Sequence, residues 1–177
     1  GRGPAAFPAS TCISVDTEVV HGIPGDRIIR DGQIVSVDVG AIVDGWHGDA
    51  ARTFIVGDAG DVVLGLVTAT RLAMMAGIAA AVPGNRVGDI SAAVEDIGKQ
   101  SGYGIVHQFV GHGIGTEMHQ DPQIPNSRTG YRGMELQPGM CLAIEPMFTL
   151  GGGDVEVMPD HWTVVTADGS LAAHFEH

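Results

Sequence analysis

QIVSVDVGAIVDGWHGDAARTFIV, residues 33–56, consists of two β-rich runs joined by the dipeptide Asp44-Gly45. An Asp-Gly pair between two such runs is a strong signal for a hairpin closed by a two-residue type I′ turn. The stretch therefore predicts an antiparallel hairpin in which Val43 is paired with Trp46 and every other pair follows from that register.

This register predicts where two carboxylates lie. Asp38 is placed opposite Ala51, and Asp49 is two residues from Ala51, so both acids lie on one face as diagonal neighbours with Cα atoms roughly 7–8 Å apart. A one-residue change in the turn would send them to opposite faces. The other face of the first strand is expected to join the core, through Val35, Val37, Val39, Ala41 and Val43.

Composition limits the classes of function. A chain of 177 residues that is 44% hydrophobic predicts one globular domain with its own core. The net charge of −12 argues against a direct nucleic-acid partner, because phosphate binding needs a basic face. Cys12 and Cys141 form no disulfide or CxxC pattern, which favours a reducing cytoplasm. No uninterrupted apolar run approaches the roughly 18 residues of a membrane span, so no membrane partner is expected.

The rest of the chain predicts an α+β fold with helices on one face of a curved, mostly antiparallel sheet. Residues 60–82 predict a long, mostly buried helix that stops at Pro83-Gly84, and residues 87–101 predict an amphipathic helix followed by Gly102. Residues 121–139 are rich in Pro, Gly and polar side chains and predict a surface loop. Short strands are expected in TCISV, EVV, MCLAIEPMFTL, DVEVMP, WTVVT and LAAHFEH.

Four acids and one histidine in unusual local contexts are candidate metal ligands: Asp38, Asp49, His112, Glu145 and Glu176. Asp38 and Glu145 interrupt apolar runs, where a carboxylate needs a partner such as a metal. Together the five could hold two divalent ions around a water molecule. Spacing alone does not choose Glu176 over its neighbours His174 and His177. His119 could bind metal or transfer protons, whereas His21, His47, His107 and His161 are interpreted as turn, surface or supporting residues.

Five motifs in this order resemble the type I methionine aminopeptidases over nearly the whole chain: VVHGIP, VDVGAIVDGWHGDAARTF, GHGIGTEMHQDP, LQPGMCLAIEPM and HWTVVTADGSLAAHFEH. The resemblance implies the pita-bread fold, two α/β halves related by a pseudo-twofold with a dinuclear metal site between them. It assigns the ligands to Asp38, Asp49, His112, Glu145 and Glu176, which resolves the choice at the end of the chain. His21 and His119 would contact the scissile group, with Glu145 as proton acceptor. Phe7, Cys12, Met118 and Trp162 match positions of the methionine pocket.

The implied reaction is removal of the N-terminal methionine from peptides and nascent chains, by a water activated between two ions of Mn, Fe, Co or Zn. The resemblance further implies a cytoplasmic monomer that works near the ribosome. The family has more chain before GRGPAAFP and after FEH, so residues 1–177 are expected to be one catalytic domain that is incomplete at both ends. The 25 residues between His119 and Glu145 favour type I over type II. His174 stands where the family has glutamine.

Two alternatives stay open at this point. An aminopeptidase P or prolidase shares the fold, the metals and the GHGIG motif, although those enzymes usually have EPG where this chain has Glu145-Pro146-Met147. The second alternative is a metal-free binding module of the same fold. The presence of all five ligand residues argues against that module.

Overall fold

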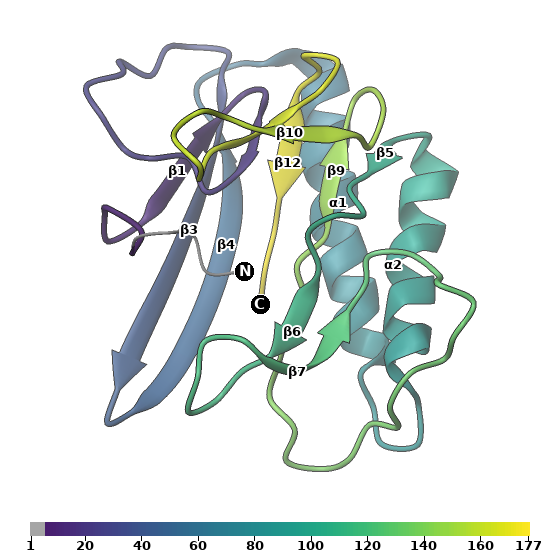
Figure 1. Cartoon of the computed structure of the whole chain (residues 1–177). Coiled ribbons are helices and arrows are strands. Elements are labelled where there is room, and N and C mark those ends of the chain that lie inside the picture. Colours follow the sequence, from purple (N-terminus) through teal and green to yellow (C-terminus); the bar gives the residue numbers. More distant parts are fainter. Residues whose placement is uncertain (1–5) are drawn as a thin grey trace.

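A computed structural model of the chain describes residues 6–177 (Figure 1). Its elements, in chain order, are β1 (Cys12–Val15), β2 (Glu18–Val20), β3 (Ile34–Val43), β4 (Trp46–Ile55), α1 (Gly60–Ala80), α2 (Val87–Ser101), β5 (Gly104–Ile105), β6 (Gly111–Gly113), β7 (Gln120–Ile124), β8 (Leu142–Ala143), β9 (Met147–Thr149), β10 (Val155–Val157), β11 (Val164–Thr166) and β12 (Ala172–His174).

The strands form four three-stranded sheets, in the orders β1-β3-β4, β10-β11-β2, β12-β9-β5 and β7-β6-β8. The strand pairs within these sheets are antiparallel. The two helices pack on each other and lie on one side of the strands, with the β3–β4 hairpin on the opposite side of β12 (Figure 1). The predicted α+β class, with helices outside antiparallel sheets, is confirmed.

The hairpin has the predicted register. Val43 pairs with Trp46 and Asp38 pairs with Ala51. Asp44 and Gly45 have φ angles of 51° and 82°, as a type I′ turn requires. Strand β1 adds to the free edge of β3 and brings Cys12 opposite Asp38. The Asp44-Gly45 turn fixes the register of β3 and β4, and with β1 paired to β3, the side chains that share a face of this sheet are determined.

One prediction about this hairpin is wrong. Val35 is buried, but Val39 is 42% exposed, Ala41 is exposed and Val43 is 69% exposed. Only the first half of β3 is covered by other elements, and the hairpin tip lies at the lower left of the view, apart from the helices at the right (Figure 1). Alternation of side chains places them on a face, but the packing of distant elements decides whether that face is buried.

The main core lies between the helices and the β12-β9-β5 sheet. Leu66 and Ala73 on α1, Ile90 on α2 and Phe148 on β9 are fully buried together. Gly77 allows the close helix contact, since a Cβ there would lie 2.9 Å from Ile144 and 3.1 Å from Val94. Both helices have nearly the predicted bounds, and α2 is followed by Gly102 with a φ of 73°.

Helix α1 departs from the sequence analysis in two ways. It is only partly buried, and four of its large apolar side chains are 48–67% exposed: Val62, Leu64, Leu72 and Met75. It also has the length and hydropathy of a membrane span, contrary to the expectation that no segment comes near one. The core helix of a globular protein meets the same criterion, and the buried face of α1 packs against α2, β9 and β12.

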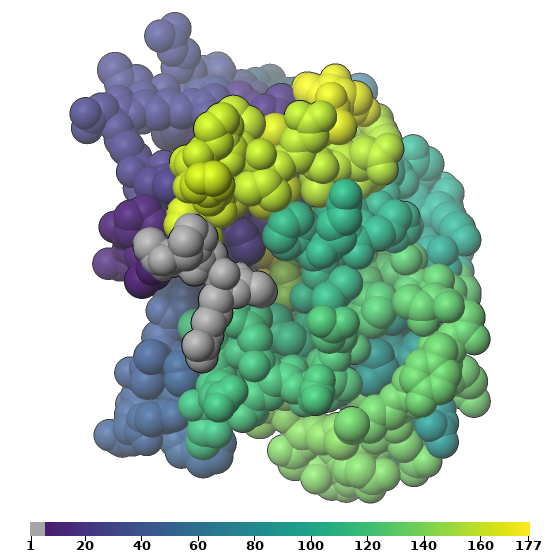
Figure 2. Space-filling view, viewed as in Figure 1, coloured from purple at the N-terminus to yellow at the C-terminus, as the bar shows by residue number. Residues whose placement is uncertain are grey.

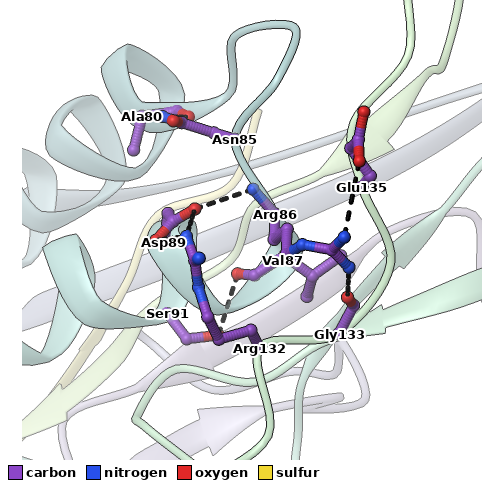
Figure 3. A network of polar contacts seen from close by, with 9 residues as sticks. All are labelled: Ala80, Asn85, Arg86, Val87, Asp89, Ser91, Arg132, Gly133 and Glu135. Atoms are coloured by element: carbon purple, nitrogen blue, oxygen red, sulfur yellow. Dashed lines mark hydrogen bonds and ion pairs between the residues drawn. The ribbon is translucent and has the colours of Figure 1, made fainter.

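The segment 121–139 is more structured than a surface loop. Its first part belongs to β7, and Ile124, Asn126 and Leu136 are buried. The remainder crosses the N-terminal end of α2, where a polar network holds it (Figure 3).

In that network Arg132 Nη2 donates to both oxygens of Asp89, at 3.0 and 2.9 Å. Arg86 Nη1 donates to the Gly133 carbonyl at 2.9 Å, and its Nη2 contacts Glu135 at 3.4 Å. Asp89 also accepts a hydrogen bond from the Arg86 backbone N–H at 2.8 Å, which caps the helix. The Pro- and Gly-rich segment 121–139 is therefore held against the N-terminal end of α2 by polar contacts and is not a free surface loop.

Candidate metal centre

Elements from three sheets deliver the five candidate ligands to one place. Asp38 and Asp49 come from the hairpin strands β3 and β4, and His112 comes from β6. Glu145 lies between β8 and β9, and Glu176 follows β12. The short glycine-flanked strand of His112 can approach closely, because a Cβ at Gly111 would lie 2.3 Å from the Ala143 carbonyl oxygen.

His112 lies at the middle of the cluster. Its Nε2 atom is 3.5 Å from Glu145 Oε1, 3.9 Å from Glu176 Oε1 and 4.0 Å from Asp49 Oδ2. One ligand atom each from Asp49, His112 and Glu176 lies within 4.8 Å of the others. Asp38 joins the group from β3, which is paired with the strand of Asp49, and it lies opposite Cys12 on β1.

The backbone sets the ring orientation of His112. Its Nδ1 atom is 2.9 Å from the carbonyl oxygen of Gly113, which can only accept, so Nδ1 carries the ring proton. The lone pair of Nε2 then faces the three carboxylates. This is the tautomer in which an imidazole binds a metal ion.

Glu176 is held in place by the hairpin. Its backbone N–H donates to the Ala51 carbonyl at 2.9 Å, and its carbonyl accepts from the Ala51 N–H at 3.2 Å. Ala51 is the residue opposite Asp38. The pairing that aligns Asp38 and Asp49 thus also positions Glu176.

The pKa values of the four clustered carboxyls are raised, so a cation is needed to stabilise their ionised forms. Burial, followed by the charge of Asp49, raises the pKa of Asp38 to about 7. Burial together with Asp49 and Asp38 raises the pKa of Glu176 to about 9. Burial also raises the pKa of Asp49, and burial with Glu176 nearby raises that of Glu145 well above its usual range. Within residues 6–177 none of these four forms an ion pair with Lys or Arg.

The donor set fits divalent metal ions. Carboxylate oxygens with one imidazole suit Mn, Fe, Co and Zn. Bound cations would offset the repulsion and burial that oppose ionisation of these acids. Cys12, on the edge of the group, has its pKa raised to about 12 by burial and by Asp38, so its thiol stays protonated and is a poor ligand.

A cleft of about 1000 Å³ opens beside the cluster. His21, His112, His119 and Glu145 line it, with Trp162 on its other side. In the space-filling view, the yellow-green segment that carries β10 and the teal-green segment that carries β6 border this face (Figure 2). The cleft therefore leads from solvent to the carboxylates.

The two predicted catalytic histidines lie in this cleft. The ring centroids of His112 and His119 are 4.3 Å apart. Burial, followed by His112, lowers the pKa of His119, and burial, followed by His119, lowers that of His21. Both rings are therefore neutral near pH 7 and can each donate one hydrogen bond. His161, interpreted from the sequence as a surface or supporting residue, also lines the cleft and is exposed.

The predicted pocket residues are only partly together. Phe7 and Trp162 form an edge contact with centroids 5.3 Å apart, and Trp162 lies 6.3 Å from the ring of His21. Cys12 instead contacts Asp38 at the metal ligands. Met118 lies against the hairpin, because its Cε would be 2.5 Å from a Cβ at Gly40.

Sequence reasoning missed two supporting residues. Phe109 packs edge-on against His21 at 5.7 Å and lines the cleft. Asn126 is 2% exposed, and its Nδ2 lies 3.2 Å from both the Phe109 and the Glu145 carbonyl oxygens. The sequence signal at Asn126 was weak, since an asparagine after Ile-Pro is usual in a loop. Only the fold shows that it links Phe109, which precedes β6, to Glu145.

Comparison with known proteins agrees with this geometry. The model of metallopeptidase family M24 matches residues 1–177. Methionine aminopeptidase of Clostridium acetobutylicum is 48% identical over 99% of this chain and 71% of its own length. Methionine aminopeptidase 1 of Mycobacterium tuberculosis is 49% identical over 97% of this chain and 67% of its own length.

A crystal structure of methionine aminopeptidase from Rickettsia prowazekii superposes with a TM-score of 0.93 at 41% identity, covering 97% of this chain and 69% of that one. The likeness confirms the pita-bread fold that the motifs implied. With matching family, sequence and structure, the chain belongs to metallopeptidase family M24 and, within it, to the type I methionine aminopeptidases.

Proposed function

We propose that the chain removes the N-terminal methionine from peptides and nascent proteins, using two divalent metal ions held by Asp38, Asp49, His112, Glu145 and Glu176. The observation that carries this proposal is the convergence of three carboxylates, those of Asp49, Glu145 and Glu176, on Nε2 of His112, beside a cleft lined by His21 and His119. The names of the relatives support the substrate class. Residues 1–177 are proposed to form one catalytic domain.

When bound, divalent ions would lower the pKa of a water molecule so that it can attack a carbonyl near neutral pH. The residues of the chain supply the remaining steps. Glu145, with its pKa raised by burial and by Glu176, is suited to accept the proton of the attacking water and return it to the leaving amine. The neutral rings of His119 and His21 would donate hydrogen bonds to the carbonyl oxygen as it gains charge.

The cleft suits a small apolar side chain at the N-terminus of a peptide. Trp162, with Phe7 at its edge and Phe109 beside His21, offers an aromatic wall to a methionine side chain. Thioether–aromatic contacts of this kind contribute roughly 0.3–1.5 kcal/mol. Cys12 and Met118 are proposed to border the same pocket from the hairpin side. Cytoplasmic location, proximity to the ribosome and a monomeric state stay predictions.

The test is hydrolysis of Met-Ala-Ser after chelation and stepwise return of Mn²⁺, Co²⁺, Fe²⁺ or Zn²⁺. Activity should follow metal content, and His112→Ala should lose both. His119→Ala should keep most of its metal affinity while its turnover falls about 100-fold or more, the size expected for a lost acid–base or oxyanion donor. Full activity in His112→Ala, or loss of metal in His119→Ala, would show that these roles are misassigned.

The same assay separates the alternatives. Cleavage of an Xaa-Pro peptide, with Met-Ala-Ser untouched, would indicate a prolidase-like enzyme. A wild-type protein that takes up no metal would indicate a binding module. Two equivalents of metal bound per chain in a calorimetric titration would support the dinuclear site, and one equivalent would contradict it.

A further inference from the structure

A buried histidine next to the metal centre has no role so far. His174 lies on β12 and is 2% exposed. Neither of its ring nitrogens has a hydrogen-bond partner among residues 6–177. The carboxylate nearest to the ring is that of Glu145, with 3.9 Å between His174 Nε2 and Glu145 Oε2.

The backbone of His174 is held by hydrogen bonds, and its side chain is enclosed by the protein. The His174 N–H donates to Thr53 Oγ1 at 2.8 Å, and the same hydroxyl donates to the His174 carbonyl at 2.8 Å. His174 also pairs with Met147 across the β12–β9 ladder, two residues after Glu145. In this register Glu145 is a diagonal neighbour of His174 on the same face.

The two imidazoles flank opposite oxygens of one carboxylate. Glu145 Oε1 lies 3.5 Å from His112, and Oε2 lies 3.9 Å from His174. A buried N–H without an acceptor costs about 1–3 kcal/mol. A shift of the carboxylate by about 1 Å would bring Oε2 to the 2.9 Å of an N–H···O hydrogen bond.

His174 is poorly placed to bind a metal itself. Among the described residues, His174 Nε2 comes within 4.0 Å of one candidate ligand, Glu145, whereas His112 Nε2 comes within that distance of Asp49, Glu145 and Glu176. His174 stands on the far side of Glu145 from His112, in contact with a ligand rather than among the ligands. His174 can therefore orient a metal ligand, whereas His112 can bind the metal directly.

We propose that His174 is a positioning residue for Glu145: its Nε2–H donates to Oε2 and holds the carboxylate in the orientation that binds metal and accepts the proton. The catalytic part of this inference rests on the proposed function, whereas the metal-binding part does not. A glutamine can offer an amide N–H in the same direction, but an aliphatic side chain cannot.

The experiment compares His174→Gln and His174→Leu, with His107→Leu as the matched control. His107 is an exposed histidine that bonds Ser127 at 2.8 Å, and its variant should behave as wild type. His174→Leu should weaken metal binding, measured by calorimetry with Mn²⁺, and lower kcat for Met-Ala-Ser, each by about 10–100-fold. KM should change less than about 3-fold, and His174→Gln should recover most of both losses.

If His174 only fills space in the core, the variants should behave differently. Leucine would then leave metal affinity and kcat unchanged and would raise the melting temperature, because two unpaired nitrogens are removed. That result would overturn the proposal, as would a His174→Gln variant as impaired as His174→Leu. Loss of one whole metal equivalent in both variants would instead make His174 a ligand.

Nitrogen-15 spectra of the Zn²⁺-loaded wild-type protein test the same point without a substitution. The ring of His174, identified by its absence in His174→Gln, should carry its proton on Nε2, and a proton on Nδ1 would overturn the proposal. If wild type binds metal in this His174-dependent way but does not cleave Met-Ala-Ser, the proposed function fails and the positioning role stands.

Discussion

Replacing Glu176 by glutamine in the metal-free protein is expected to increase its stability at pH 7. Glu176 is 5% exposed, and burial next to Asp49 and Asp38 raises its pKa from 4.5 to about 9. The folded state therefore keeps the proton over a pH range in which the unfolded state releases it. Wild-type stability is greatest below the unfolded pKa and falls as the pH rises toward 9.

The size of the stability difference follows from the gap between the unfolded pKa of Glu176 and the pH of the measurement. Each pH unit above the unfolded pKa costs the folded state ~1.4 kcal/mol, so the penalty at pH 7 is ~3 kcal/mol. Glutamine has nearly the same shape and no charge to lose, so the variant avoids this penalty. For a chain of this length ~3 kcal/mol corresponds to a rise in melting temperature of about 6–12 °C.

The assay is thermal unfolding in chelator at pH 5, 6 and 7, by calorimetry or circular dichroism. The difference between Glu176→Gln and wild type should shrink to below ~1 kcal/mol at pH 5, because that pH is only about half a unit above the unfolded pKa of the glutamate. Glu156→Gln is the matched control, because Glu156 is an exposed glutamate on β10. Adding Mn²⁺ should reverse the order, since wild type gains stability from a ligand that the variant binds poorly.

Two results would refute this reasoning. One is a Glu176→Gln variant less stable than wild type at pH 7 in chelator, which would mean that an unseen partner stabilises the carboxylate. The other is a difference between the two proteins that does not change from pH 5 to pH 7. Either would remove the physical ground for a cation at this position.

Two further substitutions test the supports of the site. Gly22→Ala should destabilise the protein by about 1–3 kcal/mol in urea unfolding and lower turnover through the adjacent His21, because the new Cβ would lie 2.3 Å from the Ile13 carbonyl oxygen; unchanged stability would show that β1 can move freely. Asp89→Ala should lower the melting temperature without changing metal affinity, because it removes the cap of α2 and the contact with Arg132; a loss of metal would mean that the segment 121–139 couples to the site.

Sequence reasoning reached part of the site by physics and part by resemblance. The Asp44-Gly45 turn predicted the shared face of Asp38 and Asp49, and the structure has that register. The choice of Glu176 over His174 came from the motifs alone. The structure gives a reason for it, since the Glu176 backbone pairs with Ala51 while His174 points at the outer oxygen of Glu145.

What the sequence by itself determined was local: the hairpin, the bounds of α1 and α2, the glycine that ends α2, and the family. Turn chemistry and side-chain periodicity act over a few residues and can be read without the rest of the chain. Tertiary structure alone decided that the hairpin tip is exposed, that residues 121–139 are tied to α2, and that Asn126 links Phe109 to Glu145. These depend on contacts between distant segments, which no local pattern records, because burial is a property of what packs against a face.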